Sequence, residues 1–120
     1  MKRRIRGDGS RVLVMGLAFK ENCPDLRNTK VVDILNELAE YNIGVDVYDP
    51  WVSTTEAEHE YGITLVAEPI AGAYDGIILA VAHNQFVTMD ADVIRKLGKL
   101  QHVLYDLKYV LPAIAADLRL

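Results

Sequence analysis

Short apolar runs alternate along this chain with segments of helical periodicity, and this alternation limits the fold more than any other feature. The runs Arg11–Gly16 and Gly76–Val81 are almost continuously apolar inside, which is typical of strands buried on both faces of a sheet. Between them, apolar residues recur over Thr29–Tyr41 at the spacing of one helix face. Strands of this kind joined by crossover helices predict a parallel sheet with both faces covered.

The whole pattern predicts an α/β fold: a doubly wound, mostly parallel five-stranded sheet with helices on both faces, Rossmann-like in architecture. The expected strands are Arg11–Gly16, Val45–Asp49, Ile63–Val66, Gly76–Val81 and His102–Asp106. The expected helices are Thr29–Tyr41, Thr54–Tyr61, Glu68–Tyr74 and Asp90–Leu97. Residues 11–120 are expected to form the domain, and the basic, then glycine-containing residues 1–10 a linker or the end of a preceding connecting helix.

Composition narrows the class of protein. The 120 residues suit one domain, and a net charge of −4 argues against sequence-independent nucleic-acid binding, which needs a basic surface. No apolar run approaches the roughly 20 residues that span a bilayer, and the N-terminus lacks the apolar core of a signal peptide. With Cys23 as the single cysteine, no intrachain disulfide can form. We therefore expect a cytoplasmic protein that binds neither nucleic acid nor membrane.

Ligands of open parallel sheets bind beyond the carboxyl ends of the strands, so the loops there are the candidate sites. The loop Leu17–Asn28 is the longest and most polar of them. It is not a glycine-rich dinucleotide loop, because Gly16 is followed by Leu, Ala, Phe, Lys and Glu. A phosphate would have to be bound by side chains, for which Lys20 and Arg27 are the candidates. Alternatively, both are surface charges paired with nearby acids.

Other loop residues have a functional and a structural interpretation. Asp49 ends a strand where a ribose-binding acid would lie, but without the glycines an Asp-Pro turn is favoured. Trp51 can stack on a base or sugar, although packing against the next helix is favoured. Cys23 would need a base such as His83 to be a nucleophile, and an ordinary loop residue is favoured. No His, Cys and carboxylate spacing predicts a metal site.

Four segments of the chain resemble the C-terminal domain of the UDP-glucose/GDP-mannose dehydrogenase family. The segment Gly16–Thr29 contains Gly-x-Ala-Phe-Lys, then Asp-x-Arg-x-Thr, then a predicted helix. The likeness continues through Val47–Pro50, Asp75–Phe86 and Tyr105–Lys108, and so covers almost the whole chain from Ser10. The sequence Phe-Lys-Glu-Asn-Cys-Pro-Asp is most similar to that of the branch whose members oxidise UDP-N-acetylhexosamines.

The resemblance implies a function and a set of site residues. Enzymes of the family oxidise C6 of a nucleotide sugar, UDP-glucose or a UDP-N-acetylhexosamine in this case, to a carboxylate with NAD. By resemblance, Phe19 and Lys20 contact the UDP-sugar, and Arg27 reaches the NAD phosphates. Lys108 lies where several members place a substrate-binding arginine, but here it is a lysine preceded by leucine. No catalytic residue is assigned to this chain.

The same resemblance implies partners. The NAD would be held mainly by an N-terminal domain, and a central helical domain would carry the catalytic cysteine and dimerise. The chain would thus not catalyse the oxidation alone, and the full-length enzyme would be a homo-oligomer. The alternative is a stand-alone α/β interaction or regulatory module without enzymatic activity. A phosphoacceptor receiver domain is disfavoured, because Met15-Gly16-Leu17 stands where an acidic cluster would be needed.

Overall fold

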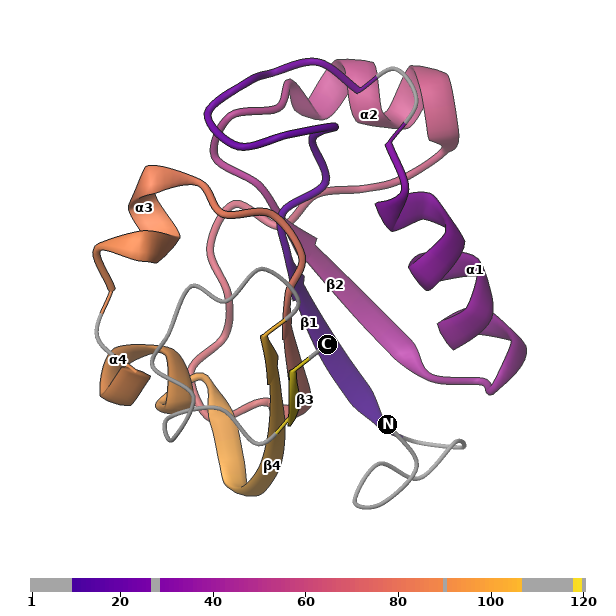
Figure 1. Ribbon diagram of the computed structural model, residues 1–120. Coiled ribbons are helices and arrows are strands. Elements are labelled where there is room, and N and C mark those ends of the chain that lie inside the picture. Colours follow the sequence, from indigo (N-terminus) through magenta and orange to yellow (C-terminus); the bar gives the residue numbers. More distant parts are fainter. Residues whose placement is uncertain (1–9, 27–28, 90, 107–117, 120) are drawn as a thin grey trace.

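The computed structural model describes residues 10–26, 29–89 and 91–106, and the backbone of residues 118–119. The sheet is parallel throughout these residues, with the strand order β2-β1-β3-β4-β5 (Figure 1). Its strands are β1 (Arg11–Met15), β2 (Gly44–Tyr48), β3 (Tyr74–Leu79), β4 (Gly98–Asp106) and β5 (Leu118–Arg119). The helices are α1 (Val31–Glu40), α2 (Thr54–Tyr61), α3 (Asn84–Val87) and α4 (Ala91–Arg95).

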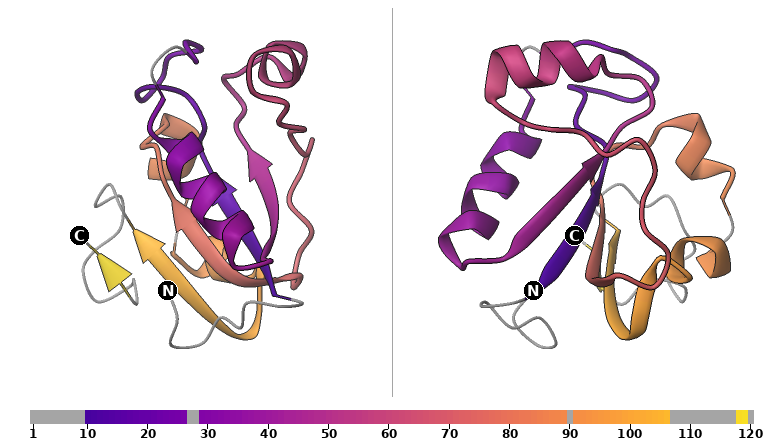
Figure 2. Two further views of the ribbon diagram at one scale, coloured as in Figure 1. Left: turned by 90° about the vertical axis from the view of Figure 1, so that its right-hand side faces the viewer. Right: turned by 180° about the vertical axis from the view of Figure 1, so that it is seen from behind.

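Two apolar layers lie on the two faces of the sheet, and β1 contributes to both. Val12 and Val14 belong to a layer that includes residues of α1 and α2, whereas Leu13 and Met15 belong to a layer that includes residues of α3 and α4. The views in Figure 2 show α1 and the pair α3 and α4 on opposite sides of the strands. Alternate side chains of a strand point to opposite faces, so a strand buried on both must be apolar throughout. The predicted doubly wound α/β fold is confirmed.

One predicted strand is nearly absent, so the predicted set of five strands is not confirmed. Ile63–Val66 forms only the single bridge between Leu65 and Val47. The left-handed residue Gly62, which ends α2, turns the chain back, and Leu65 alone reaches the edge of β2. The fifth strand of the sheet is instead the two-residue β5, which pairs with the end of β4.

Three other segments also differ from the prediction. The expected helix Glu68–Tyr74 is wrong: it contains the left-handed Gly72, which interrupts a helix, and Tyr74 already belongs to β3. The segment Asn84–Val87, expected to be loop, forms the short helix α3. Gly98 opens β4 directly after α4 instead of only ending a helix. None of the helices in the described residues has the length and apolarity that crossing a bilayer requires.

Candidate functional site

The segment after β1 turns over the carboxyl edge of the sheet at Gly16. This residue has φ +108°, and a Cβ built on it would lie 2.6 Å from Cβ of Val81 and 2.9 Å from the Val81 nitrogen. Only glycine fits both the backbone angle and the close approach. The turn lies where the chain runs from β1 to β2 on one side and later to β3 on the other. Loops separate at such a switch point, which is where open α/β sheets bind ligands.

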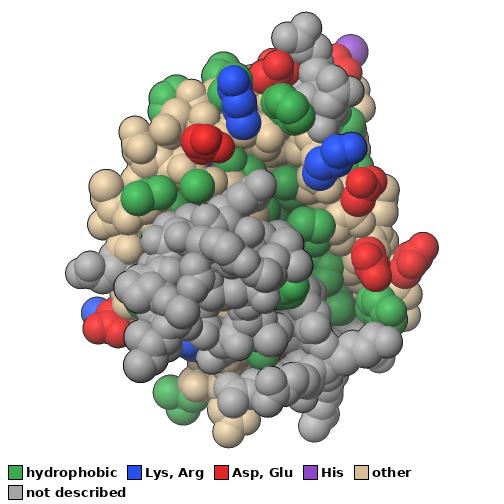
Figure 3. Space-filling model, in the orientation of Figure 1, with side chains coloured by type: hydrophobic (Ala, Val, Ile, Leu, Met, Phe, Trp, Pro, Cys, Tyr) green, Lys and Arg blue, Asp and Glu red, His purple; other side chains and the backbone are tan. Residues whose placement is uncertain are grey.

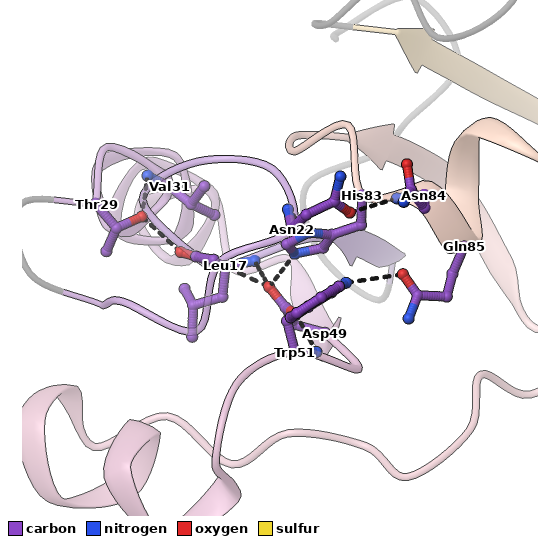
Figure 4. Close-up of polar contacts among 10 residues, drawn as sticks. Leu17, Asn22, Thr29, Val31, Asp49, Trp51, His83, Asn84 and Gln85 are labelled. Carbon is purple, nitrogen blue, oxygen red and sulfur yellow. Dashed lines mark hydrogen bonds and ion pairs between the residues drawn. The ribbon is translucent and has the colours of Figure 1, made fainter.

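Asp49, the residue after β2, lies beneath the start of this segment and forms hydrogen bonds with its backbone. Its Oδ2 accepts hydrogen bonds from the backbone N–H groups of Leu17, at 2.7 Å, and Ala18, at 2.9 Å. Its Oδ1 accepts one from the N–H of Trp51, at 2.8 Å, which makes the predicted Asp-Pro turn. Oδ2 also lies 3.0 Å from Nε2 of His83 (Figure 4). Asp49 therefore joins the loops that follow β1, β2 and β3.

The hydrogen bonds around Asp49 keep it ionised in the interior. Burial would raise the pKa of this carboxyl, but the bond from His83 and those from the backbone of Leu17, Ala18 and Trp51 lower the pKa below its ordinary value. A buried carboxylate thus occupies the two amides that a dinucleotide phosphate would approach in a glycine-rich loop. This arrangement agrees with the sequence-based interpretation that any phosphate here must be bound by side chains.

Trp51 and His83 stack at this edge of the sheet. Their ring centroids are 6.0 Å apart with an interplanar angle of 29°. The indole Nε1 of Trp51 donates to Oε1 of Gln85 at 2.8 Å, and 36% of the residue stays exposed. The prediction that Trp51 packs against the next helix is therefore wrong. The hydrogen bond to α3 holds the indole beside His83.

Of the four predicted site residues, the structure describes two. Phe19 is 50% exposed and Lys20 is exposed, and both lie in the segment that Asp49 holds. Arg27 and Lys108 lie outside the described residues, so their predicted contacts stay predictions. In the described part of the chain no ion pair involves Lys20, so its alternative interpretation as part of a surface ion pair has no support there.

The C-terminal end of the segment that follows β1 is also fixed by hydrogen bonds. The Thr29 hydroxyl donates to the carbonyl of Leu17 at 2.6 Å and accepts from the N–H of Val31, the first residue of α1. The Tyr61 hydroxyl at the end of α2 donates to the carbonyl of Leu26 at 2.7 Å. Figure 3 shows basic side chains in the upper part of the molecule, with hydrophobic and acidic side chains beside them. The surface has the mixed chemistry that a nucleotide requires.

Nucleophilic catalysis by Cys23 has no support. The only base that the sequence offered, His83, is fully buried, and its ring nitrogens lie within hydrogen-bond distance of Asp49 and of the Asn22 backbone. A general base must have a nitrogen available for the nucleophile. Among the described residues no group of three or more His, Cys, Asp or Glu could hold a metal ion.

A second polar cluster lies at the opposite, amino end of the strands. Nη2 of Arg11 lies 2.8 Å from Oδ1 of Asp46, and the Tyr74 hydroxyl donates to Oδ2 of Asp46 at 2.7 Å. Burial raises the pKa of Tyr74, and its bond to Asp46 adds to the rise. Both carboxylate oxygens are thus taken by partners within the sheet. We interpret this cluster as structural.

Comparison with known proteins decides the family. Residues 13–113 match the model of the UDP-glucose/GDP-mannose dehydrogenase family, UDP binding domain. The chain belongs to this family. Over all 120 residues this UDP-binding domain is 72% identical to UDP-N-acetyl-D-glucosamine 6-dehydrogenase of Pseudomonas aeruginosa. It is 52% identical, over the same length, to the enzyme of that name from Salmonella typhi. The predicted resemblance, including its UDP-N-acetylhexosamine branch, is confirmed.

Solved structures of related dehydrogenases share the fold of this UDP-binding domain. A UDP-glucose dehydrogenase from the archaeon Pyrobaculum islandicum matches 93% of the chain with a TM-score of 0.69 and 30% identity. An NDP-N-acetyl-D-galactosaminuronic acid dehydrogenase from Methanosarcina mazei matches 89% with a TM-score of 0.76 and 24% identity. The chain covers 25% and 22% of those two chains, and 28% of the Pseudomonas and Salmonella relatives.

Sequence reasoning missed the structural roles of Asp49 and His83. Asp49 was interpreted as a turn residue, with a ribose-binding acid as the alternative, and His83 was considered only as a possible base for Cys23. Apart from Trp51, the hydrogen-bond partners of the two residues lie 31 or more positions away along the chain, beyond the range of any local pattern. One signal was present: Asp49 is the last residue of one predicted strand and His83 comes two residues after another, so both belong to the same edge of the sheet.

Proposed function

We propose that this chain is the nucleotide-sugar-binding part of an NAD-dependent UDP-sugar 6-dehydrogenase, and that the sugar nucleotide is UDP-N-acetylglucosamine. The proposal is supported by membership of a family of UDP-binding domains and by 72% identity to a relative with that substrate in its name. The geometric observation that carries it is the segment after β1, which is anchored at the switch point and exposes Phe19 and Lys20.

The exposed side chains of this segment match the chemistry of UDP. The Lys20 ammonium is a compact cation that suits a diphosphate oxygen, and the Phe19 ring offers an apolar surface to a base or sugar. Backbone amides contribute less, because those of Leu17 and Ala18 are taken by Asp49. Lys108, which comes two residues after the end of β4 in the sequence, is proposed as a further contact to UDP. These side-chain contacts replace the glycine cradle of a dinucleotide site.

The rest of the enzyme is part of the same proposal. NAD would be bound mainly by another domain, with Arg27 directed to its phosphates, and the catalytic cysteine would lie in a central helical domain. The reaction oxidises the C6 alcohol of the sugar to a carboxylate in two hydride transfers, which reduce two NAD in turn, and water supplies the second carboxylate oxygen. Residues of this chain bind and orient the nucleotide sugar and carry out no chemical step. We propose a cytoplasmic homo-oligomer as the complete enzyme, in line with a role in surface polysaccharide synthesis.

Titration calorimetry of this chain with UDP tests the proposal. We expect saturable binding, weakened about tenfold or more by Lys20→Ala, the size expected from losing one charge-assisted hydrogen bond. Lys99→Ala is the matched control, because Lys99 is an exposed lysine at the amino end of β4, paired with Asp75. Its loss should leave UDP affinity unchanged. No binding heat at millimolar UDP, or equal effects of the two variants, would contradict the proposed site.

A further inference from the structure

The exposed part of the segment after β1 lies between two internal attachment points. At one end, Asp49 accepts from the amides of Leu17 and Ala18. At the other, Nδ1 of His83 accepts from the N–H of Asn22 at 2.9 Å. Phe19, Lys20 and Glu21 are the residues between these points, and the N–H of Phe19 bonds back to the Asp25 carbonyl. The conformation of Phe19 and Lys20 therefore depends on where Asp49 and His83 lie.

The hydrogen bonds of His83 assign its proton. Nδ1 faces a backbone donor and must be an acceptor, so Nε2 carries the hydrogen and donates to Oδ2 of Asp49. The side chains of His83 and Asp49 are both 0% exposed. Water cannot replace the bond between His83 and Asp49 without opening the interior, which gives the pair a fixed geometry, and the bond to Asn22 is partly buried. The His83 ring thus links Asp49 to Asn22, so that the location of Asp49 determines where the Asn22 backbone lies.

Asn22 also fixes the segment to α3. Its backbone is left-handed, with φ 56°, a conformation that asparagine tolerates better than most residues. Its Oδ1 accepts from the N–H of Asn84, the first residue of α3, at 2.8 Å. Figure 4 shows Asn22 between His83 and Asn84, with Asp49 on the other side of the His83 ring. The segment after β1 and the segment after β3 are therefore joined at two points, through backbone and side chain.

We infer that Asp49 and His83 are positioning residues of the nucleotide-sugar site, which hold Phe19 and Lys20 in their binding conformation through Leu17, Ala18 and Asn22. The inference rests on the proposed function for its ligand. It assigns His83 no contact with UDP and no proton transfer. The pair instead reduces the conformational freedom that the segment would lose on binding, which raises affinity without a new contact.

Amide hydrogen exchange of the wild-type chain is the first test, because it needs no ligand. The Asn22 amide should be protected although it lies near the tip of an exposed turn. The amides of Lys20 and Glu21 have no acceptor in the described residues and should exchange at least about tenfold faster. An Asn22 amide that exchanges as fast as that of Glu21 would show that His83 does not hold the segment, and would overturn the inference.

Substitutions at His83 test whether protection of the Asn22 amide and UDP affinity change together. His83→Leu removes both ring contacts and should speed Asn22 exchange and weaken UDP binding, each about two- to tenfold, as expected for one lost hydrogen bond. His83→Gln keeps a donor and an acceptor on a polar side chain and should recover part of both losses. The gain with Gln separates positioning from packing, since Gln and Leu both lack the ring and differ in their ability to form hydrogen bonds.

His102→Leu is the matched control, because His102 is also a buried histidine, but at the amino end of the sheet. It should leave UDP affinity and Asn22 exchange unchanged in the temperature range where it is folded. Equal UDP affinities of wild type, His83→Leu and His83→Gln would refute the inference while leaving the proposed function intact. If the wild type binds no UDP, the proposed function fails, and the exchange of Asn22 alone decides whether the pair positions the segment.

Discussion

Asp49→Asn is the substitution whose effect follows most directly from the contacts. The carboxylate accepts four hydrogen bonds, three at Oδ2 and one at Oδ1, and every partner is a donor. Asparagine can place its oxygen at Oδ2 and keep three of them. Its NH2 group then faces the N–H of Trp51, and two donors meet at a partly buried position.

The loss of hydrogen bonds determines how far the free energy of unfolding falls in Asp49→Asn. An unsatisfied buried donor costs about 1–3 kcal/mol, and the three remaining bonds become weaker because they lose the charge of the acceptor. Part of this loss is offset, because a neutral amide is easier to bury than a carboxylate. We therefore expect Asp49→Asn to lower the free energy of unfolding by about 2–4 kcal/mol. Asp49→Ala, which leaves all four donors without a partner, should approach the whole stability of a typical domain, about 5–15 kcal/mol.

Urea denaturation followed by circular dichroism measures this change, with a lower midpoint and an unchanged slope as the expected signature. Glu58→Gln is the control, since it neutralises an exposed carboxylate on α2 and should change stability by no more than about 0.5 kcal/mol. An Asp49→Asn variant as stable as Glu58→Gln would show that Asp49 is not the buried acceptor described here.

Two further predictions follow from the same edge of the sheet. Gly16→Ala should destabilise the chain by about 2–4 kcal/mol, read from its thermal midpoint, because alanine strains at φ +108° and its Cβ would overlap Val81. Asp49 should make the free energy of unfolding depend on pH. Its folded-state pKa lies below the ordinary value of 3.8, so its contribution to stability is full above pH 3.8 and is lost as the pH falls through the folded-state pKa. Urea midpoints between about pH 5 and pH 2 should fall less for Asp49→Asn than for wild type, and parallel curves would refute the assignment.

The sequence predicted the centre of the sheet well and its margins poorly. The runs around Val14 and Ile78 are buried on both faces of the sheet. A strand buried in this way consists of apolar residues only, and such a run can be recognised directly in the sequence. The run Ile63–Val66 is also mostly apolar but has only one bridge to β2, and no local pattern distinguishes a paired from an unpaired short run. The missed helix α3 is a single turn, too short to show helical periodicity.

The candidate site was predicted in part for a similar reason. Phe19 and Lys20 belong to a contiguous motif, which can be recognised along the chain. Asp49 and His83 act through partners far away in sequence, so their roles become visible only once the sheet brings the strand ends together. The favoured turn interpretation of Asp49 was right about Trp51 but did not include the amides of the first loop.

We propose that UDP binds at the segment after β1, through side chains at the carboxyl edge of the sheet. Amide chemical-shift mapping of this chain during a UDP titration tests this binding site directly. We predict that the largest shifts fall on Ala18 to Glu21, with smaller ones on Asn22 and Asn84. Shifts centred instead on the amino-end residues Arg11 and Tyr74, or no shifts at saturating UDP, would contradict it.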